Sequence, residues 1–165
     1  MSPYTSRQQA AGFAICFLAT LLAAGAGAIA SAEAQAFYGQ LERPYWAPPA
    51  QVFGPVWSVL YLAMAVAAWL VWRRHDTPSR RRGLFLFALQ LVLNALWSWL
   101  FFAWQWGAAA LVDITLLWLL VAATMANFWR VRAAAGFLMV PYLFWVSFAA
   151  VLNLALWRLN PELLS

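Results

Sequence analysis

Amide and aromatic side chains recur at helical spacing in three apolar segments of the chain. Gln90 and Asn94 lie four residues apart, and Trp97 and Phe101 continue the same helical face. Because an amide is costly to place against lipid, we expect this face to point into a helical bundle. Residues with this spacing along one helical face are here called a stripe. The second stripe consists of Trp57, Tyr61, Met64 and Ala68. The third consists of Tyr142, Trp145, Ala149 and Leu152.

Two interpretations of these stripes follow. If they converge, they form an apolar pocket with a few orienting polar groups, which is typical of a site for a flat lipophilic ligand. The alternative is a tightly packed core, in which Gln90 and Asn94 only bond neighbouring helices. The pattern alone supports both equally.

Groups for conventional catalysis are scarce. One histidine, His75, and one cysteine, Cys16, are too few for a His/Cys metal cluster or a haem held by two histidines. The chain has no Gly-rich phosphate loop, no H-E-x-x-H and no G-x-S-x-G sequence. Asp113 is the only acid inside an apolar segment, so a paired-carboxylate mechanism in the bilayer is excluded. We therefore expect no metal site and no required cofactor.

Asp113 itself has two interpretations. It is a polar contact or proton site at the pocket wall, or it bonds a neighbouring helix. The second is favoured because no other acid accompanies it.

The composition is that of an integral membrane protein. Apolar residues make up 66% of the 165 residues and charged residues 9%, against about 45–50% and about 25% in soluble domains. Dividing the chain at its charges predicts helices near residues 10–30, 50–72, 84–103, 108–129 and 133–157, each long enough to cross a bilayer. We predict one all-α, multi-pass domain of five transmembrane helices over residues 1–165, in a bacterial inner or outer membrane.

The net charge of +5 is explained by topology and does not indicate a nucleic-acid partner. Eight of the ten arginines fall at the N-terminus or in the second and fourth loops, which lie on one side of a five-helix bundle. That side is cytoplasmic if the protein occupies an inner membrane.

The longest predicted connection, residues 31–49, is expected to be a lid, because long loops are often functional. The prolines from Pro44 to Pro49 should hold Trp46 over the mouth of the bundle. Arg43 is the only basic residue of this segment. It is expected to pair with a lipid phosphate or with a carboxylate of a ligand, and the lipid is slightly favoured.

The segment from Arg43 to Met64 reads RPYWAPPAQVFGPVWSVLYLAM. It resembles the opening of the second helix in the TspO/MBR family, the tryptophan-rich sensory proteins and the mitochondrial translocator protein (peripheral benzodiazepine receptor). The resemblance continues through Gln90-Leu91, Asn94, Trp97, Phe101-Phe102, Ala110 to Asp113, Ala122 to Thr124, and Pro141 to Arg158.

The resemblance implies a homodimeric five-helix membrane protein. Such a protein binds porphyrins such as protoporphyrin IX, and in animals it also binds sterols and other lipophilic small molecules. Its implied role is in the transport or sensing of tetrapyrroles or in stress regulation. It implies that the pocket is lined by Ala23, Gly27, Trp46, Phe53, Gly54, Trp57, Asn94, Trp97, Asp113, Trp145, Ala149 and Leu152. Leu154 stands where the animal proteins carry a tyrosine of a sterol motif, which argues against sterol recognition through that motif. Ala109 replaces a pocket tryptophan of the animal proteins, so drug-type ligands are expected to bind differently.

Two alternatives remain beside porphyrin binding. One is an enzyme that degrades porphyrin in a light- or oxygen-dependent reaction, with Trp57 and Trp145 as the candidate redox side chains. The other is a structural membrane protein whose aromatic interior is simply packed, which predicts no saturable porphyrin binding.

Overall fold

The computed structural model describes residues 5–74 and 78–165, so His75 lies outside the described residues. These residues form helices and no strand. The long helices are α1 (Ser6–Ala30), α3 (Phe53–Trp72, preceded by the 3-10 turn η1, Ala50–Val52), α4 (Pro78–Ser98, continued by the π-helical turn η2, Trp99–Ala103), α5 (Gly107–Val131) and α6 (Ala133–Leu159). All five are long and apolar enough to cross a membrane, which confirms the predicted all-α transmembrane fold.

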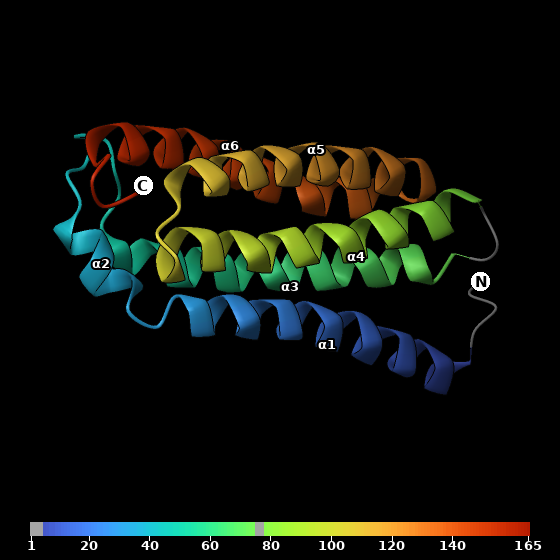
Figure 1. Cartoon of the computed structure of the whole chain (residues 1–165). Coiled ribbons are helices and arrows are strands. Elements are labelled where there is room, and N and C mark those ends of the chain that lie inside the picture. Colours follow the sequence, from blue (N-terminus) through green and yellow to red (C-terminus); the bar gives the residue numbers. More distant parts are fainter. Residues whose placement is uncertain (1–4, 75–77) are drawn as a thin grey trace.

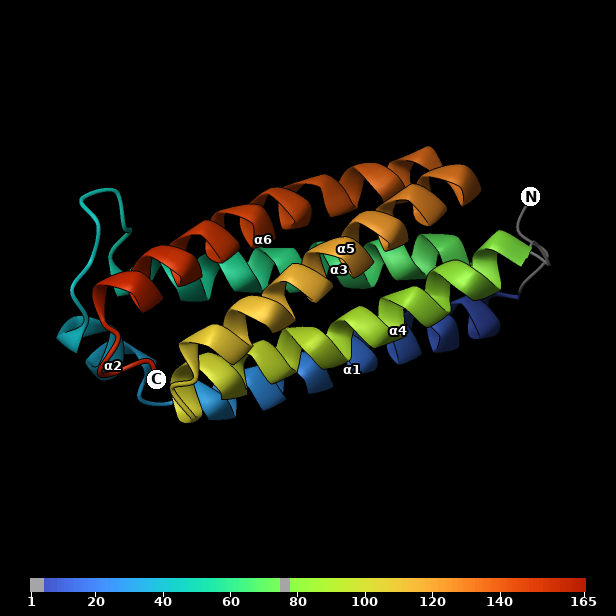
Figure 2. The same cartoon turned by 45° about the horizontal axis from the view of Figure 1, so that its top comes forward.

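The five long helices run lengthwise beside one another (Figure 1). α5 packs against α4 and α6, and α1 packs against α3 and α4. The start of α1 and the end of α3 lie at one end, whereas α2 and the C-terminus lie at the other (Figure 2). The apolar side chains of Leu22 and Phe144 are 74% and 73% exposed. Such residues cover the outer face, where hydrocarbon is their natural solvent.

Residues 31–49, here called the lid segment, contain a short helix that the sequence analysis did not predict. This helix, α2, spans Ala34–Gln40 and buries Phe37 and Tyr38. Seven residues are too few to show a helical period, and the helix has no side-chain cap that would mark its start. Tertiary packing therefore decides this element.

The three predicted stripes face inward, as expected. Gln90 is 0% exposed and Asn94 2% exposed, because both lie where α4 meets the other helices. Met64, Tyr142 and Ala149 are also buried in the main core. The period of 3.6 residues therefore identified the correct face of each helix.

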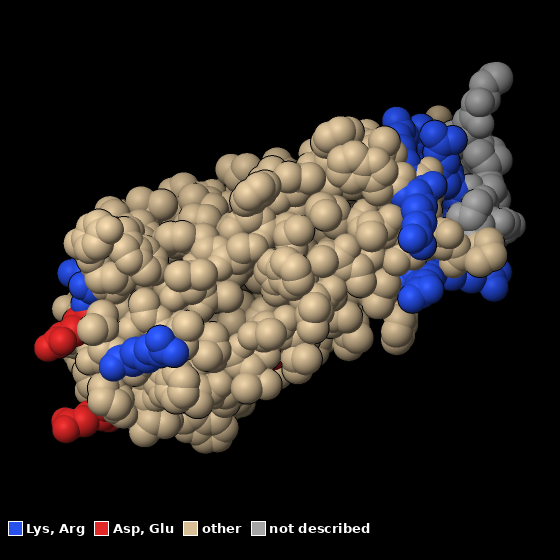
Figure 3. Space-filling view, turned by 90° about the horizontal axis from the view of Figure 1, so that it is seen from above, with Lys and Arg blue, Asp and Glu red and all other residues tan. Residues whose placement is uncertain are grey.

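Charge is distributed unevenly along the molecule, as Figure 3 shows. Basic side chains gather at the end where α1 begins, and acidic side chains are seen at the opposite end (Figure 3). The arginines next to this end are Arg7, Arg73, Arg74, Arg80, Arg81, Arg82, Arg130 and Arg132. Helix order thus places all eight together, as the arginine count predicted.

A close approach between α5 and α6 yields a first prediction. A Cβ built at Gly136 would lie 2.9 Å from Trp129 Cβ and 2.6 Å from its Cε3. Because the Trp129 Cβ is fixed by the α5 backbone, Gly136→Ala should force the helices apart and destabilise the protein by about 1–3 kcal/mol. At Gly25 a Cβ meets nothing within 4 Å, so Gly25→Ala should not destabilise. Thermal unfolding of both variants in the same detergent checks this, and equal stabilities would contradict it.

Candidate functional site

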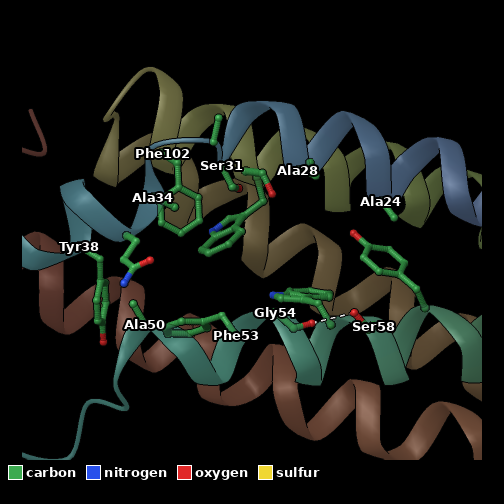
Figure 4. Close-up of a pocket in the computed structure, with 17 residues that line it drawn as sticks. Ala24, Ala28, Ser31, Ala34, Tyr38, Ala50, Phe53, Gly54, Ser58 and Phe102 are labelled. Atoms are coloured by element: carbon green, nitrogen blue, oxygen red, sulfur yellow. Dashed lines mark hydrogen bonds between the residues drawn. The ribbon is translucent and has the colours of Figure 1, made fainter.

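A cavity of about 520 Å³ lies at the end of the bundle that carries α2. α1 and α3 form opposite walls, and α2 closes one end (Figure 4). The lining residues are Ala24, Gly27, Ala28, Ser31, Ala32, Ala34, Gln35, Tyr38, Ala50, Phe53, Gly54, Trp57, Ser58, Tyr61, Trp97, Ser98 and Phe102. None of them is charged. The volume is in the range of sites for small organic ligands, about 300–1,000 Å³.

Small residues make room for the cavity. On α1 the wall consists of Ala24, Gly27 and Ala28, so the helix contributes almost no side-chain volume. On α3 Gly54 lines the cavity, and a Cβ there would meet nothing within 4 Å. Ser58 donates its hydroxyl to the Gly54 carbonyl oxygen at 2.9 Å, as the dashed line in Figure 4 marks. Ser58 is therefore satisfied within its own helix.

The remaining walls are aromatic. Trp57 lies 5.5 Å from the Tyr61 ring and 6.5 Å from the Trp145 ring, measured between ring centroids. Trp97 stacks on Phe101 at 5.3 Å and 13°. These contacts are within the usual range of aromatic pairs and hold the rings in fixed orientations.

A small recess of about 20 Å³ continues from the cavity toward α6. It shares five wall residues with the main cavity, namely Tyr38, Phe53, Trp57, Trp97 and Phe102, and adds Phe101, Trp145, Ala149, Leu152, Asn153 and Leu156. Its size leaves no room for a ligand group unless the aromatic side chains move. Trp145 Nε1 is buried here without a hydrogen-bond partner among the described residues.

A chain of polar side chains runs behind the cavity. The Tyr61 hydroxyl donates to Asn94 Oδ1, and Asn94 Nδ2 donates to the Tyr142 hydroxyl at 3.0 Å. The Tyr142 hydroxyl in turn donates to Gln90 Oε1 at 2.8 Å. Tyr61 alone among these residues also lines the cavity. The structure thus favours the second interpretation of the two amides, as bonds between helices.

A second polar pair fixes Trp97. Its Nε1 donates to Asn153 Oδ1 at 3.0 Å, and Asn153 Nδ2 donates to the Gly107 carbonyl oxygen at 3.1 Å. Asn153 is 1% exposed, so this pair is shielded from competing partners. The ring of Trp97 is therefore held by α5 and α6 while its face lines the cavity.

Tyr38 joins two parts of the lid segment, because it bonds Pro48 near the end of the segment. The Tyr38 hydroxyl donates to the Pro48 carbonyl oxygen at 3.0 Å, and its ring packs edge-on against Phe53 at 5.4 Å. The Arg43 guanidinium lies 5.1 Å from the centre of the same ring. Burial raises the pKa of the Tyr38 phenol above its usual value, although Arg43 acts in the opposite direction. The phenol therefore stays protonated and remains a hydrogen-bond donor.

The predicted pocket residues fall into three groups. Those that line the main cavity are Gly27, Phe53, Gly54, Trp57 and Trp97, and those that line only the recess are Trp145, Ala149 and Leu152. Ala23, Arg43, Trp46, Asn94 and Asp113 line neither space.

Two residues of the last group are placed differently from expectation. Trp46 packs on Phe148 of α6 at 5.9 Å and is 38% exposed, so the proline-rich turn carries it to the side of α6, away from the cavity wall. Asp113 is 5% exposed, and its Oδ2 has no hydrogen-bond partner within residues 5–74 and 78–165. The expected bond from Asp113 to a neighbouring helix is therefore not made by this oxygen within the described residues.

Several lining residues were not predicted. They come mainly from the end of α1 and from α2, and include Ala28, Ser31, Ala34, Gln35 and Tyr38. Small and neutral residues carry little signal in a sequence that is apolar throughout. The available signal is the run of small residues around Gly27, whose short side chains leave the space for the cavity.

Comparisons with a family model and with individual known proteins identify the same family. The sequence model of the TspO/MBR family matches residues 14–158, which confirms the resemblance. The "Tryptophan-rich protein TspO" of Chlorobaculum tepidum is 44% identical over 129 residues, covering 76% of this chain and 80% of the relative. "Protein CrtK" of Rhodobacter capsulatus is 39% identical over 150 residues, covering 90% and 92%. The human "Translocator protein" is 38% identical over 130 residues, covering 78% and 77%.

Proposed function

Because the chain belongs to the TspO/MBR family and is a multi-pass integral membrane protein, we propose that it binds a porphyrin of the protoporphyrin IX type. The uncharged cavity between α1 and α3 is the proposed site, and its main support is the aromatic wall of Phe53, Trp57 and Trp97. Flat apolar rings are held by such walls through stacking and buried area. We propose a role in tetrapyrrole transport, sensing or stress regulation, with a homodimer in the membrane as the assembled form.

The chemistry of the lining predicts that a metal in the porphyrin adds nothing to affinity. None of the lining residues is a histidine, cysteine or methionine. The two lining tyrosines, Tyr38 and Tyr61, donate their hydroxyls to Pro48 O and Asn94 Oδ1, so neither is free to act as a phenolate axial ligand. Protoporphyrin IX and haem should therefore quench the intrinsic tryptophan fluorescence with dissociation constants within about threefold of one another. A strong preference for haem would contradict binding by stacking and shape.

Arg43 is the proposed partner of the ligand's carboxylates. It is exposed and stacks on Tyr38, which lines the cavity, so its guanidinium lies next to the cavity wall and outside the apolar interior. A charge-assisted hydrogen bond at this boundary is worth about 1.5–3 kcal/mol at best. Arg43→Ala should therefore weaken protoporphyrin IX binding about tenfold and leave its dimethyl ester, which lacks the carboxylates, nearly unchanged. Equal losses for both ligands in a fluorescence titration would show that Arg43 acts only by supporting Tyr38.

A second candidate function is light- or oxygen-dependent breakdown of the bound porphyrin. It is favoured by the edge-to-face pair of Trp57 and Trp145, 6.5 Å apart, of which Trp57 lines the cavity and both line its recess. An indole so placed could be oxidised by an illuminated porphyrin. If Trp57→Phe and Trp145→Phe degrade porphyrin under light as fast as the unmodified protein, this function loses its support.

A further inference from the structure

The chain after α6 folds back against the lid segment. Asn160 Oδ1 accepts a hydrogen bond from the Glu42 N–H at 2.8 Å, and Asn160 Nδ2 donates to the Glu42 carbonyl oxygen at 2.9 Å. One side chain thus satisfies both backbone groups of a residue 118 positions away in the sequence. Asn160 is 6% exposed, so water has little access to compete for these bonds.

The chain after α6 also places an apolar side chain, Leu164, in a buried position next to the lid segment. Leu164 is 0% exposed and belongs to the cluster that contains Phe37, Tyr38 and Leu41 of the lid segment. The N–H groups of Leu163 and Leu164 both donate to the Asn160 carbonyl oxygen, at 3.2 and 3.0 Å. This turn joins the polar pair of Asn160 to the buried Leu164, and residues 160–164 are here called the latch.

The lid segment connects the contact between Asn160 and Glu42 to the cavity wall at Tyr38. Glu42 follows Leu41, which is 4% exposed, and lies four residues after Tyr38. Tyr38 lines both the cavity and its recess, and its hydroxyl holds Pro48 at the far side of the segment. A displacement of Glu42 would therefore move the wall that Tyr38 forms.

We propose that Asn160 is a positioning residue and that the latch holds the lid segment, and with it the Tyr38 wall, against the cavity. Release of the latch is then the step that loosens this end of the binding site. The consequence for a ligand rests on the proposed porphyrin-binding function, whereas the mechanical coupling between latch and lid segment does not.

Hydrogen–deuterium exchange of the full chain in lipid nanodiscs tests the coupling without any ligand. In Asn160→Ala the backbone amides of residues 38–43 and 45–47 should exchange about tenfold faster, since two hydrogen bonds to Glu42 are lost. Asn160→Asp keeps an acceptor for the Glu42 N–H and loses the donor, so its exchange should be intermediate. The matched control is Asn127→Ala, because Asn127 is also a buried amide but donates to Ala123 O in its own helix. It should leave exchange in the lid segment unchanged.

Two results would overturn the proposal. One is unchanged exchange in the lid segment of a folded Asn160→Ala protein; the other is faster exchange spread equally over α4 and α5, which would indicate general destabilisation. With protoporphyrin IX as the probe, Asn160→Ala should also release ligand several-fold faster than Asn127→Ala, and equal release rates would show that the latch does not act on the site. If the unmodified protein binds no protoporphyrin IX, the proposed function fails while the exchange result still decides the latch.

Discussion

Gly54→Phe should reduce protoporphyrin IX affinity about 100-fold or more, because the new ring would occupy the space that the ligand needs. Gly54 lines the cavity, and a Cβ there meets nothing within 4 Å, so a side chain at this position begins in open space. The Ser58 hydroxyl donates to the backbone carbonyl oxygen of residue 54, which is present with any side chain there, so this bond is retained. Fluorescence titration in nanodiscs measures the change.

The chain offers a matched control for this substitution at Gly25. It is also an exposed helical glycine with open space around its Cβ position, but it does not line the cavity. Gly25→Phe should therefore bind protoporphyrin IX as the unmodified protein does. If both variants bind normally, the porphyrin does not occupy the cavity between α1 and α3.

Asn94→Leu should destabilise the protein by about 2–4 kcal/mol, because it breaks the polar chain that joins three helices. Asn94 is 2% exposed and stands between the Tyr61 and Tyr142 hydroxyls. Leucine has a similar volume, so the main effect is that Tyr61 loses its acceptor and Tyr142 its donor. Thermal unfolding in detergent measures the loss.

Asn127→Leu is the comparison for this effect. Asn127 is 7% exposed and donates to a backbone oxygen of its own helix, so its replacement should cost less than about 1 kcal/mol. Equal losses in the two variants would show that the polar chain adds nothing to helix association. Normal porphyrin binding by a folded Asn94→Leu protein would further separate this structural role from ligand contact.

The helices and their inward faces could be predicted from the sequence because a bilayer imposes two strong constraints. Each crossing needs about 20 apolar residues, and polar side chains such as Gln90 and Asn94 must turn away from lipid. The aromatic stripes followed the same period, so Trp57, Trp97 and Trp145 were correctly placed in the interior. Trp118 departs from this rule: it is 37% exposed and donates to the Ser147 hydroxyl at 2.8 Å. A hydrogen-bond partner on the neighbouring helix α6 thus allows this tryptophan to lie partly at the outer surface.

The helix α2 and the contact between Asn160 and Glu42 could not be predicted from the sequence. α2 is stabilised by burial of Phe37 and Tyr38 against distant helices, and its seven residues show no period of their own. The Asn160 contact joins residues 118 positions apart through backbone groups, which every residue has. Much of the end wall of the cavity therefore depends on tertiary contacts that leave no local pattern.

Equilibrium binding of protoporphyrin IX to the protein in nanodiscs, measured against empty nanodiscs of the same lipid, tests the central proposal most directly. Because the aromatic cavity has a volume of about 520 Å³, we expect the bound amount to saturate at one porphyrin per chain. This binding adds to the porphyrin that partitions into the lipid, which rises linearly with concentration. Uptake that rises linearly and equals that of empty nanodiscs would contradict the proposal, and would indicate instead a structural membrane protein with a packed aromatic interior.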